Sequence, residues 1–242
     1  MAMVLVPFLF WRGTWFGRKL GEEETGRYLS DSEHPRRVQH ALVQIGERIV
    51  AADAGVKRWY PEVMRLASHP QLEIRSTAAW VMGQDNQSQE FHAALLGLLQ
   101  DAEPLVRHNA ALGLVRFGDD SGRPELRAML LPYSLTASAD GVLSPRLQAG
   151  DPVNPGTLMG RIETGAEAAL EIRSPLPGEI REWLASNGAR VKAGEPLLLL
   201  SPSEDQLWEA LRAFYLVGQA EDLPAVEAFA HALPELSERI RQ

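Results

Sequence analysis

The chain contains no cysteine among its 242 residues. This absence excludes disulfide bonds, a thiol nucleophile and cysteine-ligated zinc or iron–sulfur sites. Lysine is almost as scarce, because only Lys19, Lys57 and Lys192 among the 24 basic residues are lysine. The net charge of −8 argues against a nonspecific nucleic-acid binder, which needs a basic surface. With 45% hydrophobic and 23% charged residues, the chain is expected to fold into one or two globular domains.

A hydrophobic run long enough to cross a membrane is also lacking. The most apolar stretch, 1–11 (MAMVLVPFLFW), would reach roughly 16 Å as a helix, about half of a hydrocarbon core. No basic region precedes it and no small-residue cleavage site follows, which argues against a secretory signal. Two interpretations stay open. In the first, residues 1–20 form an apolar arm that packs on the protein itself. In the second, the segment from Met1 to Phe16 is a truncated membrane anchor that contacts the inner membrane peripherally, and the remaining chain lies in the cytoplasm.

Three segments repeat one helical pattern: 35–46 (PRRVQHALVQIG), 74–83 (IRSTAAWVMG) and 106–118 (VRHNAALGLVRFG). Each places small alanines on a stripe with larger apolar residues, which lets a neighbouring helix approach closely. Each ends in glycine, which favours a left-handed C-cap. Amphipathic stretches at 60–67 and 91–99 precede the second and third copies, so the pattern predicts repeated helical hairpins.

These segments resemble HEAT repeats of the phycobilisome-lyase-like kind over about residues 35–131. The first copy departs from the others, since Arg37 stands where they have Ile74 and Val106. The resemblance implies an α–α solenoid, and most chains with such repeats are binding scaffolds. A lyase activity, suggested by the family name, is kept only as a remote alternative.

From residue 134 to 201 the sequence changes to short apolar runs separated by glycine and proline, which indicates β-strands. Two halves echo each other, because four positions match at a constant offset of 38 residues: Val153 and Val191, Gly156 and Gly194, Met159 and Leu197, and Ile162 and Leu200. The segments SPLPG (174–178) and GARVKAGEPL (188–197) resemble the biotinyl/lipoyl domain, an all-β barrel-sandwich hybrid built from two intertwined halves.

In the carrier members of that family, a lysine on the turn between the halves receives the prosthetic group. Counting back from Ser174, this position falls near Glu167, and a carboxylate cannot form the amide that tethers biotin or lipoate. Lys192, which is the only lysine of the segment, belongs to the other turn. We therefore expect no cofactor, and the resemblance instead implies a docking module or a purely structural insertion.

The repeat length indicates where the β segment is inserted. Residues 205–218 read as another inner helix, and Ala210 stands 100 residues beyond Ala110. Removing the β segment restores the repeat length of 32, so the segment is predicted to interrupt a helical hairpin made by 124–131 and 205–218. The predicted fold is multidomain: an apolar arm (1–20), HEAT-like repeats (21–133), an inserted barrel-sandwich hybrid (134–201), and further repeats with a tail (202–242).

Chemistry-bearing residues do not form a recognised catalytic or metal-binding pattern. The six histidines include no H-x-x-x-H or HExxH pair, and neither G-x-S-x-G nor a phosphate-binding loop is present, so no enzyme activity and no metal are expected. Arg75 and Arg107 suggest an ion-pair ladder with acids such as Glu73, Asp101 and Glu103. In the alternative, Arg37, Arg75, Arg107 and His108 line the inner surface and bind an acidic partner.

Two tryptophans, Trp80 and Trp208, stand among alanines and leucines at helical spacing, which indicates core packing. The predicted function is a noncatalytic protein-interaction scaffold. The alternative is a membrane-tethered accessory subunit of a bacterial envelope transport system, similar to membrane-fusion adaptors.

Overall fold

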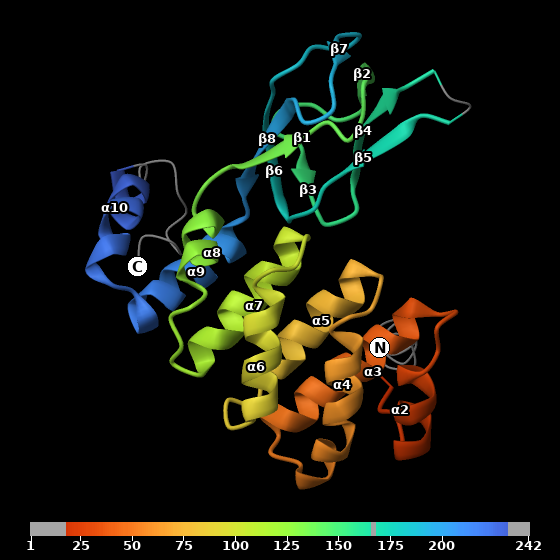
Figure 1. Cartoon of the computed structure of the whole chain (residues 1–242), viewed down its shortest axis with the longest axis vertical. Coiled ribbons are helices and arrows are strands. Elements are labelled where there is room, and N and C mark those ends of the chain that lie inside the picture. The colour runs from red at the N-terminus through yellow and green to blue at the C-terminus, as the bar shows by residue number, and fades with distance from the viewer. Residues whose placement is uncertain (1–17, 166–167, 232–242) are drawn as a thin grey trace, which may run out of the picture.

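The computed structural model describes residues 18–165 and 168–231, which form a row of helical hairpins and a separate β region (Figure 1). The helices, including two short 3₁₀ segments, are α2 (Glu22–Leu29), α3 (Pro35–Val50), η1 (Ala54–Trp59), α4 (Tyr60–Leu66), α5 (Leu72–Met82), α6 (Gln89–Leu98), α7 (Pro104–Arg116), α8 (Arg123–Met129), α9 (Glu204–Val217), η2 (Ala220–Asp222) and α10 (Leu223–His231).

The helices pack as consecutive pairs, α2 with α3, α4 with α5, α6 with α7 and α8 with α9. The second members, which we call the B helices, also pack against one another in the order α3, α5, α7 and α9. The alanine stripe explains this stacking, because the equivalent residues Ala41, Ala78, Ala110 and Ala210 are all completely buried. The predicted helical hairpins are confirmed, including the inner helix over 205–218.

The predicted left-handed caps are correct at only one of the three glycines. Gly118 has a φ of +72° and follows the end of α7 as expected. Gly46 instead lies inside α3, which continues to Val50, and Gly83 has a right-handed φ of −65°. Both of these glycines serve close helix packing, since a Cβ atom at Gly83 would lie 2.8 Å from the Cα of Gly113 on α7.

The β region consists of two antiparallel four-stranded sheets. Their strands run β1–β8–β6–β3 in one sheet and β5–β4–β2–β7 in the other. The strand bounds are β1 (Tyr133–Thr136), β2 (Gly141–Pro145), β3 (Pro152–Val153), β4 (Leu158–Glu163), β5 (Leu170–Arg173), β6 (Gly178–Trp183), β7 (Arg190–Val191) and β8 (Pro196–Pro202).

Each sheet combines two strands from the first half of the region with two from the second. The two halves of the region, β1–β4 and β5–β8, are equivalent: exchanging β1 with β5, β2 with β6, β3 with β7 and β4 with β8 turns the strand order of one sheet into that of the other. An internal repeat requires this equivalence. The 38-residue offset predicts the core correctly: Val153, Val191, Met159, Leu197, Ile162 and Leu200 are all buried in one cluster. Gly156 and Gly194 share a left-handed backbone, with φ of +83° and +82°.

The chain enters and leaves the β region at adjacent points. The first and last strands are neighbours, with Tyr133 of β1 opposite Leu200 of β8. The helices on either side, α8 and α9, share a hydrophobic cluster, and the Gln206 side chain donates a 3.0 Å hydrogen bond to the carbonyl of Met129. The sheets therefore interrupt one helical hairpin without separating its two helices (Figure 1).

Some predictions concern residues outside the described part of the chain. These are the apolar segment from Met1 to Phe16, the carrier-lysine position at Glu167 and the tail over 232–242. Within the described ranges, none of the helices is both long and apolar enough to cross a membrane.

Candidate functional site

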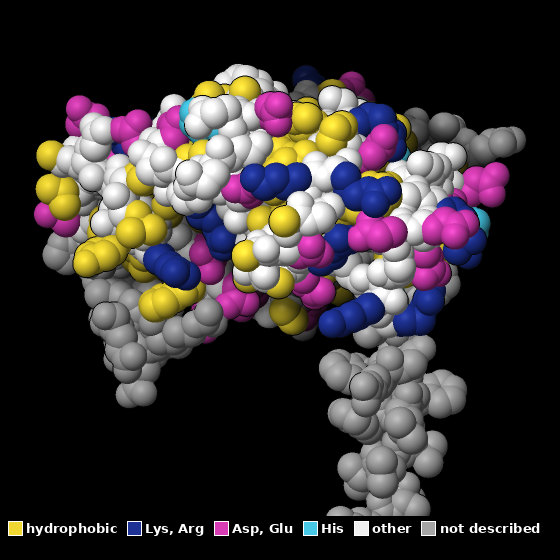
Figure 2. Space-filling model, turned by 90° about the horizontal axis from the view of Figure 1, so that it is seen from below, with side chains coloured by type: hydrophobic (Ala, Val, Ile, Leu, Met, Phe, Trp, Pro, Cys, Tyr) yellow, Lys and Arg dark blue, Asp and Glu magenta, His cyan; other side chains and the backbone are white. Residues whose placement is uncertain are grey.

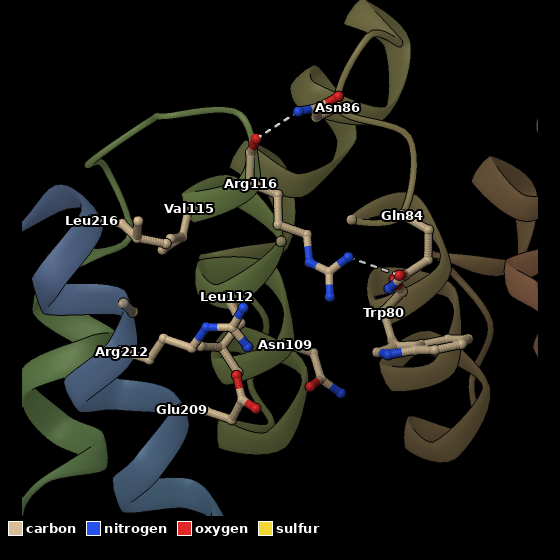
Figure 3. A pocket seen from close by; sticks show the side chains of 13 residues that line it. Trp80, Gln84, Asn86, Asn109, Leu112, Val115, Arg116, Glu209, Arg212 and Leu216 are labelled. Atoms are coloured by element: carbon tan, nitrogen blue, oxygen red, sulfur yellow. Dashed lines mark hydrogen bonds between the residues drawn. The ribbon is translucent and has the colours of Figure 1, made fainter. Parts of the chain in front are cut away.

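A groove crosses three consecutive B helices, α5, α7 and α9 (Figure 3). Its cavity volume is about 680 Å³. The groove is lined by Trp80, Gly83, Gln84, Asn86, Asn109, Leu112, Gly113, Val115, Arg116, Glu209, Arg212, Ala213 and Leu216. Because the lining side chains come from three separate repeats, the groove depends on the way the hairpins stack.

Small residues account for the hollow between the helices. Gly83, Gly113 and Ala213 contribute almost no side-chain volume where α5, α7 and α9 meet. The close approach of Gly83 to Gly113 brings the ends of α5 and α7 together. Larger residues one turn away, Trp80 and Leu216, then stand above this floor and form the apolar walls.

Trp80 forms the wall on the α5 side. Its indole packs against Gly46 of α3, where an added Cβ atom would lie 2.9 Å from Cη2 of the ring. Even so, 38% of Trp80 is exposed to solvent, so the prediction that it is a core residue is wrong. The ring is supported by a neighbouring helix on one side and remains accessible from the groove. Trp208, in contrast, packs against the cluster shared by α8 and α9 as predicted.

The polar lining has an excess of positive charge, with Arg116 and Arg212 against Glu209. Figure 3 shows Arg116 extending from α7 and Arg212 from α9 into the space between the helices. Gln84 accepts a 2.8 Å hydrogen bond from Arg116 and so orients its guanidinium. Asn109 donates to the hydroxyl of Ser76 at 2.7 Å, which leaves its amide oxygen as an acceptor.

The arginines expected from the sequence lie elsewhere, close to the first turns of the B helices. Arg75 donates two hydrogen bonds to the carboxylate of Asp101, at 2.7 and 2.9 Å. Arg107 pairs with Glu125 at 2.9 Å, and Arg37 pairs with Asp31 at 2.8 Å.

Arg75 and Arg107 also bind the backbone of the turn before their own helix. Arg75 donates to the carbonyls of His69 and Pro70, and Arg107 to those of Asp101 and Ala102. The two ion pairs, Arg75 with Asp101 and Arg107 with Glu125, form a ladder between successive repeats. Asp101 is one of the acids suggested by the sequence, and Glu125 is a new one. Whether Arg37, Arg75 and Arg107 also bind a partner stays a prediction.

His108, the fourth residue of that set, is buried in α7 with 5% of its surface exposed, so a partner would not reach it. Burial and the nearby Arg107 lower the pKa of His108 to about 4, so the imidazole is neutral at pH 7. The Glu125 carboxylate, 3.8 Å from its Nε2 atom, therefore faces an uncharged ring.

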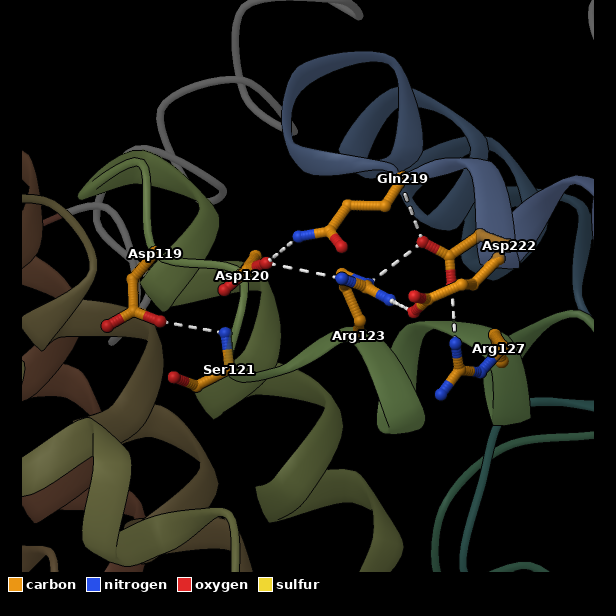
Figure 4. A network of polar contacts seen from close by, with 8 residues as sticks. Asp119, Asp120, Ser121, Arg123, Arg127, Gln219 and Asp222 are labelled. Carbon is orange, nitrogen blue, oxygen red and sulfur yellow. Dashed lines mark hydrogen bonds and ion pairs between the residues drawn. The ribbon is translucent and has the colours of Figure 1, made fainter.

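A second network of charges fixes the end of the helical row (Figure 4). The nearly buried carboxylate of Asp222 accepts hydrogen bonds from the backbone N–H of Gln219 at 2.9 Å and from Arg127, and it pairs with Arg123 at 2.9 Å. Burial alone would raise the pKa of Asp222, but these partners lower it instead. The network links α8 to η2, which directly precedes α10, so its role is structural.

Among the described residues, close histidine–aspartate pairs outside the groove include His34 with Asp31, 2.9 Å apart, and His92 with Asp119. His92 and Asp119 are 2.7 Å apart, and the backbone N–H of Ser121 donates to Asp119. Among the residues that the structure describes, no group of three or more His, Cys, Asp or Glu side chains gathers as metal ligands do. Lys192 lies on the exposed turn between β7 and β8, where its backbone N–H donates to Glu195.

The surface view from below adds an apolar region at the end formed by α9 and α10 (Figure 2). Tyr215, Leu216 and Leu223 are exposed there by 89%, 61% and 54%. Leu216 belongs to this apolar end and to the groove at once.

Three residues of the groove, Arg116, Arg212 and Leu216, were not predicted from the sequence, although the repeats contain a signal for them. When the segments are aligned on their buried alanines, Trp80, Leu112 and Arg212 occupy one position. Gln84, Arg116 and Leu216 occupy the position four residues later, which is the same helix face. These two positions define the groove in every repeat that contributes to it.

Comparison with known proteins identifies the helical repeats. Residues 60–139 match the family model of HEAT repeats. The matched segment runs from α4 through α8 and ends shortly after β1. HEAT repeats generally mediate protein–protein interactions. A search of curated proteins finds no match.

One solved structure with detectable similarity is described as a single-chain, multi-domain long-chain acyl-CoA carboxylase. The similarity covers 55% of this chain and 14% of that protein, with 18% sequence identity and a TM-score of 0.28. The chain thus corresponds to a small part of that protein's length, and a likeness at this level carries no argument about fold or activity.

Proposed function

We propose that the protein is a noncatalytic interaction scaffold and that a segment of a protein partner binds in the groove of the B helices. The observation that carries this proposal is the combination of exposed apolar walls, Trp80 and Leu216, with oriented polar groups across three stacked repeats. Stacked helical repeats offer an extended surface of this kind, and apolar side chains flanked by polar ones are typical of binding sites.

We further infer that the β region is a biotinyl/lipoyl-like barrel-sandwich hybrid that carries no prosthetic group and acts as a second docking surface. The exchange of strands between its two halves supports this assignment. The carboxylate of Glu167 at the expected carrier position and the location of Lys192 on the other turn support the absence of a carrier function.

The test is a pull-down from the native host with the wild-type chain and two matched variants. Leu216→Asp places a charge in the groove, whereas Leu96→Asp places the same charge on α6, at another exposed leucine. A partner recovered stoichiometrically with the wild type and Leu96→Asp, and lost with Leu216→Asp, is the expected result. Equal recovery with all three chains, or no partner at all, would contradict the proposal.

A second candidate function is a membrane-tethered accessory subunit of an envelope transport system. The apolar sequence of residues 1–11, followed by Trp15, Phe16 and basic residues, favours it. Fractionation of cells that express the full chain separates the two candidates. Recovery in the membrane fraction supports the tether, and complete recovery in the soluble fraction excludes it.

A further inference from the structure

The groove is a local region of positive charge on an acidic protein. The net charge of the chain is −8, yet Arg116 and Arg212 both reach into the groove, where Glu209 is the acidic side chain. Most other arginines near the B helices are neutralised: Arg75 by Asp101, Arg107 by Glu125, and Arg123 by three acids.

Arg116 and Arg212 differ from these arginines in their partners. Within the described residues, neither forms an ion pair. The Arg116 side chain donates to the neutral amide of Gln84, which holds the guanidinium in place and leaves its other N–H groups available. An arginine that is oriented but not neutralised is suited to a carboxylate from another molecule, because two N–H groups can bind both oxygens at once.

Apolar surface lies on both sides of these charges. Trp80 and Leu216 form the walls, and Leu112 lies between them on α7. A segment bound in the groove therefore needs bulky apolar side chains that pack on Trp80, Leu112 and Leu216, together with carboxylates that pair with the arginines.

We propose that the groove binds an acidic amphipathic segment of a protein partner, whose carboxylates pair with Arg116 and Arg212 and whose bulky apolar side chains pack on Trp80 at one wall and on Leu216 at the other. This inference rests on the proposed scaffold function and specifies the chemistry of the segment that is bound. Recognition of this kind uses apolar anchors for affinity and charge for orientation and choice of partner.

The experiment is a selection of random 15-residue peptides displayed on phage against the full-length protein, followed by affinity measurements with synthetic copies. A peptide counts as groove-dependent when Leu216→Asp abolishes its binding and Leu96→Asp does not. We expect groove-dependent peptides to be enriched in Asp or Glu and to contain Leu, Phe or Trp. Their affinity is expected to fall as the salt concentration rises, because the pairs are partly exposed.

Charge reversal gives the decisive comparison. The double variant Arg116→Glu/Arg212→Glu is expected to weaken such a peptide at least about tenfold. The matched control, Arg181→Glu/Arg190→Glu, changes the net charge by the same amount on exposed strands of the β region and is expected to leave the affinity unchanged. A peptide with its acidic residues replaced by lysine is expected to prefer the reversed groove over the native one.

The outcomes separate the two proposals. Groove-dependent peptides without acidic enrichment, or with affinities unaffected by charge reversal, would overturn this inference and leave the scaffold function standing. Failure to select any groove-dependent peptide would count against both. If peptides bind only after residues 232–242 are removed, the tail of the chain itself occupies the groove, and the inference of a partner segment is wrong.

Discussion

The indole of Trp80 on α5 packs directly against Gly46 on α3, so that a Cβ atom at position 46 would lie 2.9 Å from Cη2 of the ring and closer still to Cζ3. This contact joins two consecutive repeats and also sets the position of one wall of the groove. Because Gly46 has no side chain, it leaves room for the ring of Trp80, which lies 34 positions further along the chain. Gly46 therefore helps to determine the shape of the candidate binding site.

The first prediction concerns this contact. Gly46→Ala is expected to destabilise the protein by about 1–3 kcal/mol, because the new methyl group overlaps a ring that the surrounding helices hold in place. Urea unfolding measures the change. Gly97→Ala is the matched control, since a Cβ atom there meets nothing within 4 Å inside α6, and it is expected to stabilise by about 0.5–1 kcal/mol. Equal effects of the two substitutions would contradict the packing argument.

The second prediction concerns the ladder between repeats. Asp101→Asn removes the negative charge and one of the two oxygens that accept hydrogen bonds from Arg75, whose side chain is only 15% exposed, and is expected to cost about 1–3 kcal/mol. Glu62→Gln, in the more exposed pair with Arg65, is expected to change stability by less than about 0.5 kcal/mol. Thermal unfolding of both variants compares them. A cost no larger at Asp101 than at Glu62 would mean that the ladder does not stabilise the stack.

The same pair depends on pH in a defined direction. Burial would raise the pKa of Asp101, but the hydrogen bonds from Arg75 and from the backbone N–H of Glu103 outweigh it and lower that pKa below 3.8. Its stabilising contribution is therefore complete above about pH 5 and is lost as the pH falls through the lowered value. The prediction is contradicted if the stabilising contribution of Asp101 is already lost between pH 7 and pH 6.

The third prediction concerns His108. Its pKa is about 4 in the folded protein and 6.5 as the ordinary value, so the unfolded chain takes up a proton first as the pH falls. The free energy of unfolding is expected to decrease by about 2 kcal/mol from this group between pH 7 and pH 5. His108→Gln, although itself destabilising, is expected to flatten that slope. If the substitution leaves the slope unchanged, the proton uptake that causes the slope occurs at a group other than His108.

The fourth prediction concerns the β region. Because Lys192 is its only lysine and stands on the turn between β7 and β8, Lys192 of protein purified from its native host is expected to carry no biotinyl or lipoyl group. Mass spectrometry that finds a biotinyl or lipoyl adduct on Lys192 would restore a carrier function and overturn the proposal of a docking module.

Local pattern predicted most of the fold. The alanine stripe of the B helices, seen at Ala41, Ala78 and Ala110, depends only on residues within one helix, and it correctly indicated which face is buried. The 38-residue offset likewise predicted the core of the β region, because inward and outward side chains alternate along a strand whatever it pairs with.

The candidate site was harder to predict, because it arises between repeats. The exposure of Trp80 depends on the size of Gly46 in the previous repeat, and the hollow beside it depends on Gly83 and Gly113 approaching each other. The acid that pairs with Arg107 is Glu125, a residue of the next hairpin. Such contacts are fixed by how the hairpins stack, which the periodicity of a single helix does not determine.

Site-specific photo-crosslinking in living cells tests the central claim most directly. A photoreactive phenylalanine derivative would replace Leu216 in the groove or, as the control, Leu96 on α6. The account predicts a discrete crosslinked product to another polypeptide from position 216, and none from position 96. Crosslinks from position 96 with none from position 216 would show that the partner binds another face, and the groove would then not be the site of interaction.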